Sequence, residues 1–553
     1  MFRFKTSAWL LLGLCAAPSL AADPAPRMSP EHLLEHTRVL SSDEFAGRAP
    51  GTRGEELSVE YLIKAFKAAG AQPGNPDGSW VQKVPLLGIR SKPTVSFSGC
   101  AAALKLSAPD DYVAWTTHAE KQVTVKASDL VFVGYGVVAP EYGWDDYKGV
   151  DVRGKTLVML INDPAIPDPA DPTRLDERMF KGRAMTYYGR WTYKFEIAAA
   201  RGAAGAIIIH ETGPAAYPYE VVRNSNSQEN ITIRSADGNA GDVALRSWLR
   251  EDKARALLGA CGQDFDALKA AAIRPDFHPV PLAAQLDARI ATTQRSIDSR
   301  NVVARIEGAD PAHRDETLIY SAHWDHFGTQ VEGGKTTIYH GALDNASAVA
   351  TLVELARMFS TEKASLKRSV LFLAPTAEET GLLGSRWYAE HPLYPLAKTV
   401  ADLNMDMVNA WGRSSDFELT GMGQTTLDDL FAREAAVQGR IVVPEAKPEN
   451  GMYFRSDHLE FVRRGVPAML SSGGRTLIGK SAAEATRLRD DFTAHRYHKS
   501  EDRVLPEWDL SGAAEDGELY YRVGRAIVRD LENADFSRDS EFRAARARLL
   551  SGS

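Results

Sequence analysis

From residue 301 onward, the chain alternates short apolar runs typical of buried strands with longer segments of helical periodicity. The predicted strands are residues 318–322, 370–374, 399–405 and 467–471, and the predicted helices are residues 347–359, 425–437 and 517–531. Repeated strand–helix units predict an α/β fold, in which a doubly wound, mostly parallel sheet carries helices on both faces. In such a sheet, active sites lie at the carboxyl ends of the strands.

Histidines and carboxylates stand at successive carboxyl ends of these predicted strands. His323 and Asp325 follow the first strand, and Asp344 lies where the next helix opens. The others are Glu378 and Glu379 after the second strand, Asp406 after the third, and His498 in a late loop. Nitrogen and oxygen donors of these types hold paired divalent metals, and zinc is the metal that we expect.

Each of these motifs has an ordinary explanation when it is taken alone. A His-x-Asp motif is more often a surface hydrogen bond, a Glu-Glu pair is usually solvated, and an aspartate after a strand is often a helix cap. Four such features in register with predicted strand ends are much harder to attribute to chance. Burying unpaired carboxylates is costly, and a pair of metal ions removes that cost.

The length of 553 residues predicts two or more domains. Residues 123–283 differ in texture from their surroundings and read as a compact β-rich insert with a helix or two, in which no metal ligands gather. We assign residues 23–122 and 284–553 to one catalytic domain. Cys100 and Cys261 could pair in an oxidising compartment, but their spacing does not decide whether they do.

The first 22 residues read as a signal peptide, with a short positive start, an apolar stretch over residues 8–20 and small residues before the cleavage point. A membrane anchor is the alternative, but this stretch is too short to span a bilayer. Lipid attachment at Cys15 is disfavoured because Leu14 is not small. We expect export to a periplasm or to the outside of the cell, with no membrane span. The net charge of −8 disfavours a nucleic-acid partner, which needs a concentrated basic face.

With these motifs, the opening segment at residues 42–48 and the run Arg455-Ser456-Asp457-His458, the chain resembles the co-catalytic di-zinc aminopeptidase family. Relatives of that family include glutamate carboxypeptidase and the transferrin receptor. The resemblance covers nearly all of the chain after the signal peptide, and it implies that residues 123–283 are an inserted protease-associated domain. It also implies a secreted enzyme that removes residues from the N-terminus of a peptide or protein.

The resemblance implies a role for each residue of the site. One zinc ion would be held by His323 and Asp406 and the other by Glu379 and His498, with Asp344 as the bridge. Glu378 would be the general base. Asp325 would orient the ring of His323, and Tyr497 would donate to the developing oxyanion. The family also implies a cis peptide bond between Asp344 and Asn345. The chain departs from the compact members in the interval from His323 to Asp344, where residues 331–335 read as an extra loop.

Two rival functions remain on the same fold. A receptor-like binding protein should lack a ligand or the base, whereas this chain keeps all of them. Carboxypeptidase, dipeptidase or glutaminyl cyclase-like activity is the stronger rival, because a fold does not fix a substrate.

Arg455 also has two interpretations. It is either a surface arginine paired with Asp457 or, by family resemblance, a cleft residue that binds a peptide carbonyl or carboxylate. In the second case Asp457 and His458 would be its supports.

Overall fold

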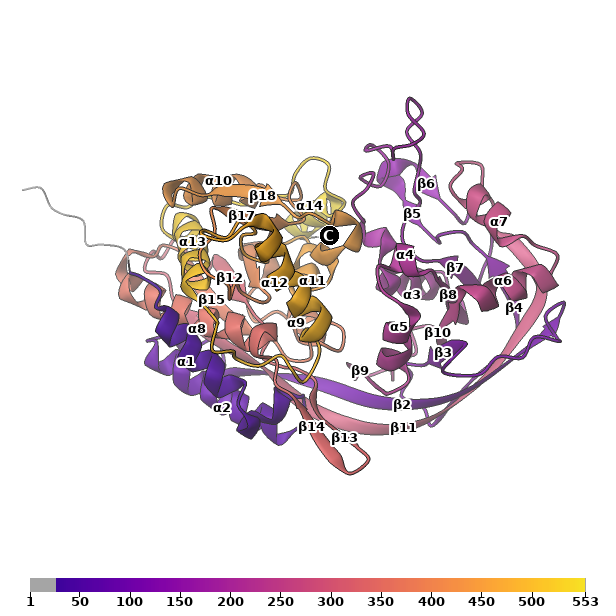
Figure 1. Cartoon of the computed structure of the whole chain (residues 1–553), viewed down its shortest axis with the longest axis horizontal. Coiled ribbons are helices and arrows are strands. Elements are labelled where there is room, and N and C mark those ends of the chain that lie inside the picture. Colours follow the sequence, from indigo (N-terminus) through magenta and orange to yellow (C-terminus); the bar gives the residue numbers. More distant parts are fainter. Residues whose placement is uncertain (1–25, 553) are drawn as a thin grey trace, which may run out of the picture.

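The computed structural model describes residues 26–552, in which a single 15-stranded sheet runs through two units (Figure 1). The unit that carries the predicted catalytic residues lies to the left in this view, and the insert lies to the right. The predicted signal peptide falls outside the described residues. Among residues 26–552, no helix is both long and apolar enough to cross a membrane.

The centre of the catalytic sheet consists of four parallel, fully buried strands. In spatial order they are β19 (Ala468–Ser471), β16 (Thr399–Met405), β12 (Thr317–Ser321) and β15 (Ser369–Ala374). β17 (Asp416–Thr420) pairs antiparallel with β19 at one side and carries the edge strand β18 (Ile441–Pro444), and β11 (Val280–Ile306) pairs antiparallel with β15 at the other. The mostly parallel sheet predicted from the apolar runs is thus confirmed.

Helices cover both faces of this sheet, as the strand–helix alternation predicts. Alternate residues of β12 show the two faces, since Leu318 and Tyr320 belong to one apolar core and Ile319 to another. The first core is closed by α1 (Pro30–Leu40), α2 (Arg53–Ala68), α8 (Ser347–Thr361) and α13 (Ser511–Val528). The second includes residues of α9 (Leu383–Glu390) and α11 (His458–Val462). The helices α10 (Leu427–Val437), α12 (Ala482–His495) and α14 (Arg543–Ser551) complete this unit.

The insert is built on parallel strands in the order β4 (Gln122–Phe132), β7 (Thr156–Leu160), β8 (Gly205–His210) and β10 (Leu245–Arg250). Its helices are α3 (Trp191–Ala200), α4 (Thr212–Ala215), α5 (Tyr219–Asn226), α6 (Glu251–Ala260) and α7 (Phe265–Ala272). These outnumber the helix or two expected from the sequence, because parallel strands need long crossover connections, which are usually helical. One apolar core, which includes Phe195 and Trp248, is formed by residues 123–283 together with Val113 and Trp115. β3 (Tyr112–Trp115) precedes residue 123 but pairs with β10.

A long two-stranded ribbon connects the two units. β2 (Val81–Gly99) pairs antiparallel with β11 from the Val81–Val302 pair to the Gly99–Ala284 pair, and the two strands run side by side between the units in Figure 1. The sequence gives little sign of this ribbon, because the outer half of β2 is partly exposed and has no continuous apolar run. Cys100 follows β2 directly and forms a disulfide with Cys261, which answers the question left open by the sequence.

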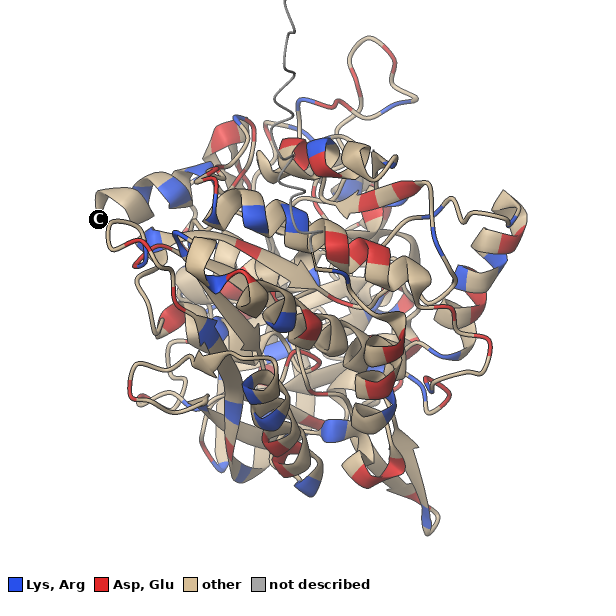
Figure 2. Ribbon diagram, turned by 90° about the vertical axis from the view of Figure 1, so that its left-hand side faces the viewer, with Lys and Arg blue, Asp and Glu red and all other residues tan. Residues whose placement is uncertain are grey.

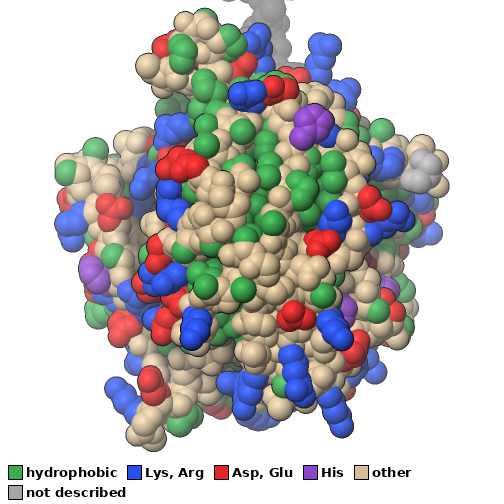
Figure 3. All heavy atoms as spheres, turned by 90° about the vertical axis from the view of Figure 1, so that its right-hand side faces the viewer, with side chains coloured by type: hydrophobic (Ala, Val, Ile, Leu, Met, Phe, Trp, Pro, Cys, Tyr) green, Lys and Arg blue, Asp and Glu red, His purple; other side chains and the backbone are tan. Residues whose placement is uncertain are grey.

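The short strands β1 (Gln72–Pro73) and β9 (Glu229–Ile233) join the same sheet, while β5 (Val138–Ala139) and β6 (Trp144–Asp145) form a small pair of their own. On the catalytic side of the molecule, acidic and basic residues are interspersed over the helices (Figure 2). On the outer side of the insert, hydrophobic side chains gather among charged ones (Figure 3).

Candidate metal centre

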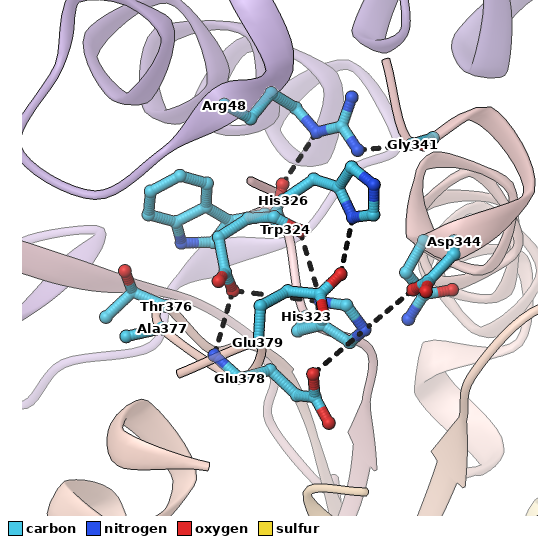
Figure 4. Close-up of polar contacts among 12 residues, drawn as sticks. Arg48, His323, Trp324, His326, Gly341, Asp344, Thr376, Ala377, Glu378 and Glu379 are labelled. Atoms are coloured by element: carbon cyan, nitrogen blue, oxygen red, sulfur yellow. Dashed lines mark hydrogen bonds and ion pairs between the residues drawn. The ribbon is translucent and has the colours of Figure 1, made fainter. Parts of the chain in front are cut away.

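The topology brings the predicted site residues together at one edge of the sheet. β16, β12 and β15 are neighbours, so the segments that follow their carboxyl ends lie side by side. Asp406, His323 and the Glu378–Glu379 pair follow these three strands, and Figure 4 shows the cluster around His323 and Glu379. Asp344 comes from the irregular turn Ala342–Ala346 before α8, and His498 from the loop after α12.

The distances divide these side chains into two groups that share Asp344. The Nε2 atom of His323 lies 3.4 Å from Asp344 Oδ1 and 3.5 Å from Asp406 Oδ1. The Nε2 atom of His498 lies 3.1 Å from Asp344 Oδ2 and 3.4 Å from Glu379 Oε2. The two oxygens of Asp344 therefore face different histidines, each of which has a further carboxylate of its own.

These separations fit metal ligation better than hydrogen bonding. Ligand atoms bound to zinc at about 2.0–2.1 Å in a tetrahedral arrangement lie about 3.3 Å from one another. The Nε2 atom of His323 is buried and has no hydrogen-bond partner among the described residues, although three carboxylates surround it. A buried nitrogen without a partner, at this spacing from carboxylate oxygens, is what an ion-binding site requires.

Burial controls the electrostatics of the centre. It raises the pKa of Glu378 well above its usual value, and the nearby carboxylates of Asp406 and Glu379 add to this while His323 opposes it. Burial also raises the pKa of Glu379, with Asp344 as the next cause. Burial works in the same direction on Asp344, but the adjacent rings of His323 and His498 outweigh it and bring that pKa well below its usual value.

Asp325 touches both His323 and the segment that carries the glutamates. Its Oδ1 atom accepts a hydrogen bond of 3.1 Å from the backbone N–H of Glu378 and lies 3.7 Å from the Nδ1 atom of His323. The backbone oxygen of Asp325 is 3.2 Å from the same nitrogen. Asp325 is fully buried, so it holds the His323 ring and the glutamate loop in a fixed relation.

The sequence analysis missed three supporting residues. Asp502 accepts hydrogen bonds from the backbone N–H groups of Leu343 and Asp344, which fixes the turn that presents Asp344. The ring of His326 bonds through Nδ1 to Glu379 Oε1 and packs so closely on Gly341 that a Cβ there would meet the ring at 2.5 Å. His326 was visible as a second histidine in the motif of His323, and Asp502 as an acid four residues after His498.

Arg48 is the third, and it acts on the backbone. Its guanidinium donates hydrogen bonds of 2.7–2.8 Å to the carbonyl oxygens of Leu40, Trp324, His340 and Gly341. The first of these ends α1, and the other three belong to the metal-site loops (Figure 4). The opening motif at residues 42–48 therefore has a physical purpose, since its arginine ties the N-terminal segment to the site.

The backbone near Asp344 also matches the resemblance, because the peptide bond between Asp344 and Asn345 is cis. The side chain of Asn345 donates to the carbonyl oxygen of Met405 at 3.1 Å and accepts from the backbone N–H of Met407 at 3.0 Å, on either side of Asp406. The predicted extra loop is the tip of a hairpin formed by β13 (Gly328–Glu332) and β14 (Lys335–Tyr339).

Tyr497 is partly buried, and its ring stacks on that of His498 with centroids 3.8 Å apart. Burial and the carboxylates of Asp344 and Glu379 raise its pKa well above the usual value, so the phenol keeps its proton. Arg455 lies at the junction with the insert and forms no ion pair with Asp457 among the described residues. Asp457 is itself fully buried beside the site.

A buried set of histidines and carboxylates at the strand ends of a doubly wound sheet, with a further glutamate beside it, defines a metallopeptidase. Residues 301–521 match the model described as peptidase family M28, a span that contains every proposed metal ligand. The model covers this catalytic part of the chain, and the resemblance predicted from its motifs is confirmed there.

Curated relatives match over shorter stretches. The chain is 31% identical over 141 residues to the aminopeptidase NAALADL1 of Mus musculus, which covers 24% of this chain and 17% of that protein. It is 29% identical over 204 residues to the probable leucine aminopeptidase 2 of Aspergillus fumigatus, which covers 34% and 37%. The chain therefore spans well under half the length of these relatives.

Among solved structures, an aminopeptidase from Aneurinibacillus sp. strain AM-1 is similar over 91% of this chain and 95% of its own, with 20% identity and a TM-score of 0.49. BSAP, a zinc aminopeptidase from Bacillus subtilis, is similar over 94% and 100%, with 17% identity and a TM-score of 0.43.

Proposed function

We propose that the protein is an exported aminopeptidase that holds two zinc ions and hydrolyses the N-terminal peptide bond of peptides. The observation that carries this proposal is the position of Asp344, whose two oxygens face His323 and His498 separately. A carboxylate placed between two half-sites is the natural bridge of a pair of metals. His323 and Asp406 would hold one ion, and His498 and Glu379 the other.

The side chains then have distinct roles. When bound, a zinc pair lowers the pKa of a shared water and polarises the scissile carbonyl. Glu378 is not needed as a ligand, and its Oε2 atom lies 3.7 Å from His323 Nε2, so its carboxylate is placed to take a proton from the attacking water and return it to the leaving amine. Tyr497 keeps its phenolic proton and can donate it in a hydrogen bond to the oxyanion. Asp325 holds His323 in orientation.

The proposed preference for the N-terminus of a peptide rests on the negative charge of the site. A free α-amino group carries a positive charge and is attracted to this cluster of buried carboxylates, whose charges outnumber that of the nearby Arg48. Carboxypeptidase, dipeptidase and glutaminyl cyclase-like activities remain the alternatives. A panel of leucine p-nitroanilide, dipeptides, N-acetylated peptides and N-terminal glutaminyl peptides separates them. Hydrolysis of free but not N-acetylated substrates by the zinc-loaded protein supports the proposal, and the reverse preference contradicts it.

Export is the remaining part of the proposal. It is supported by the signal-like first 22 residues and by the disulfide between Cys100 and Cys261, since disulfides persist in oxidising compartments. Fractionation of a bacterial expression host tests it. Processed protein in the periplasm or medium is the expected result, and unprocessed protein confined to the cytoplasm contradicts it.

A further inference from the structure

Two arginines meet at the junction between the insert and the catalytic unit, and neither has an anionic partner. Arg190 directly precedes α3 of the insert, and Arg455 lies just before α11 of the catalytic unit. The Nε atom of Arg190 and the Nε and Nη2 atoms of Arg455 are buried and have no hydrogen-bond partner among residues 26–552. Of the five N–H donors in each planar fork, one in Arg190 and three in Arg455 are thus buried and unused.

Tyr217 joins the two guanidinium groups into one cluster. The guanidinium carbon of Arg455 lies 5.8 Å from the centre of the Tyr217 ring. The pKa of Arg190 is lowered to about 10, first by burial and then by the charge of Arg455. Both arginines act on the pKa of Tyr217, which burial raises. Two like charges and a phenol therefore share one partly enclosed space.

Other arginines at the same junction have carboxylate partners. Arg463 donates to Glu460 at 3.0 Å and to Glu196 of the insert at 2.8 Å, and Arg183 of the insert donates to Glu449 at 2.8 Å. The junction therefore supplies carboxylates where arginines serve to join the two units. Leaving two adjacent guanidiniums without one costs free energy, and such a cost is typical of a binding site.

The cluster lies close to the metal ligands. Ser456, the residue after Arg455, accepts a 2.6 Å hydrogen bond from Asn404, which precedes Asp406 by two residues on β16. The next residue, Asp457, is near enough for its charge to act on Glu378. A substrate whose N-terminal residue is held by the metal centre can therefore extend towards the two arginines.

The geometry points to a carboxylate-binding site formed by Arg190, Arg455 and the Tyr217 hydroxyl, which holds the C-terminal carboxylate of a short peptide. This inference rests on the proposed aminopeptidase function and adds the substrate class to it. A guanidinium fork matches a carboxylate with two parallel hydrogen bonds, and the phenol supplies a further donor. Because the insert contributes Arg190 and Tyr217, the insert takes part in selecting substrates by length.

The test compares free acids with C-terminal amides. Leu-Gly, Leu-Gly-Gly and Leu-Gly-Gly-Gly are assayed in both forms with the zinc-loaded wild type, together with leucine p-nitroanilide. At the length that reaches the arginines, kcat/KM for the acid should exceed that for the amide by about 10- to 100-fold, the effect of a hydrogen bond to a charged group. In Arg190→Gln and Arg455→Gln, this ratio should fall to near 1, chiefly through KM. An internal arm with Leu-Glu amide shows whether a side-chain carboxylate is accepted instead.

Arg183→Gln is the matched control, because it removes an arginine from the same junction but not from the cluster. It should keep the wild-type ratio. Thermal unfolding gives an independent readout, since Arg190→Gln removes an unpaired buried charge and should leave Tm unchanged or higher. An acid-to-amide ratio near 1 in the wild type, a preference confined to Leu-Glu amide, or a large loss of Tm in both variants would overturn the inference. Failure of the wild type to cleave any of these substrates would instead overturn the proposed function.

Discussion

The metal centre and the interior of the insert both bury carboxylates, but they balance the charge differently. In the insert, Lys194 is fully buried and donates to the carbonyl oxygens of Tyr135 and Asn162 at 2.6 and 2.8 Å. Its charge acts on Asp146 and Asp163, and each of these carboxylates accepts two further hydrogen bonds. The chain itself supplies the cation there.

At the carboxyl ends of the catalytic strands, the carboxylates outnumber the arginine beside them. Asp344, Glu378 and Asp406 surround His323. The hydrogen bonds of Arg48 go to backbone carbonyls, and its charge acts on Asp325, Asp344, Glu379 and Asp502. The difference shows how a structural cluster is told from a functional one. A buried set of charges that is complete within the chain stabilises the fold, whereas one with a surplus needs something from outside.

The largest effect expected from this comparison concerns the two adjacent glutamates. Glu378→Gln should lower kcat by about 10²–10⁴-fold, the usual contribution of a general base, while both zinc ions remain bound. Glu379→Gln should instead weaken one zinc ion, because it removes a ligand. Metal content by atomic absorption and turnover of leucine p-nitroanilide are the measurements. If Glu378→Gln lost metal and Glu379→Gln kept it, the assignment within the pair would be reversed.

The second prediction concerns the cluster of Lys194, Asp146 and Asp163 inside the insert. At pH 6, where Lys194 is protonated in the folded chain, Lys194→Met should destabilise the protein by about 3–5 kcal/mol, because it leaves two buried carboxylates without their cation. Zinc content at low temperature should be unchanged, since the cluster is part of the insert. Lys126→Met is the control, as that lysine is exposed on β4 of the same unit. Urea unfolding measures the free energy of unfolding of both variants. Equal values would show that the charge of Lys194 is not needed to stabilise the two buried carboxylates.

The third prediction concerns the support of a ligand. Asp325→Asn keeps the shape of the side chain but removes the charge beside His323, so zinc affinity should fall by about 10- to 100-fold. Competition with a zinc-binding dye measures this without any assay of activity. Asp129→Asn offers a surface control whose partner is Gln285, and its zinc affinity should equal that of the wild type. An unchanged affinity in Asp325→Asn would leave the aspartate only as a backbone anchor for Glu378.

The last prediction concerns the pH dependence of the cluster of Lys194, Asp146 and Asp163. Burial lowers the pKa of Lys194 to about 7, below its ordinary value. Between that pH and about 10.5, the unfolded chain binds the proton and the folded one does not, so this group makes stability rise with pH, by at most about 1.4 kcal/mol per pH unit. Unfolding of the wild type and of Lys194→Met at pH 6–10 tests this. The wild type should gain stability relative to the variant above pH 7, and parallel curves would contradict it.

The sequence was sufficient for the regular parts of the fold. The strands and helices of the catalytic sheet follow from their apolar periodicity, because each is buried on both faces or along one stripe. The ribbon of β2 and β11 could not be predicted from the sequence, since a partly exposed pair of strands needs no continuous apolar run. The pairing of Cys100 with Cys261 likewise depends on long-range geometry that spacing alone does not contain.

The site divides in the same way. His323, Asp344, Glu379, Asp406 and His498 could be proposed as metal ligands from the sequence, because such ligands must be particular residue types, and strand ends are where they gather. Arg190 could not be recognised in this way, because its proposed role depends on the absence of a carboxylate partner. Only the three-dimensional structure shows that it and Arg455 come from different units, lie together, and have no carboxylate between them. The absence of a hydrogen-bond partner produces no residue pattern that can be recognised in a sequence.

The length of the ribbon of β2 and β11 also determines how far the insert lies from the catalytic unit. A strand advances about 3.4 Å per residue. Two residues added to both strands would preserve which side chains face which side and move the insert outward by about 7 Å. Duplication or loss of such paired residues would therefore change the distance between the insert and the proposed metal site. Related proteins could in this way evolve to accept longer or shorter peptides while every proposed metal ligand stays the same.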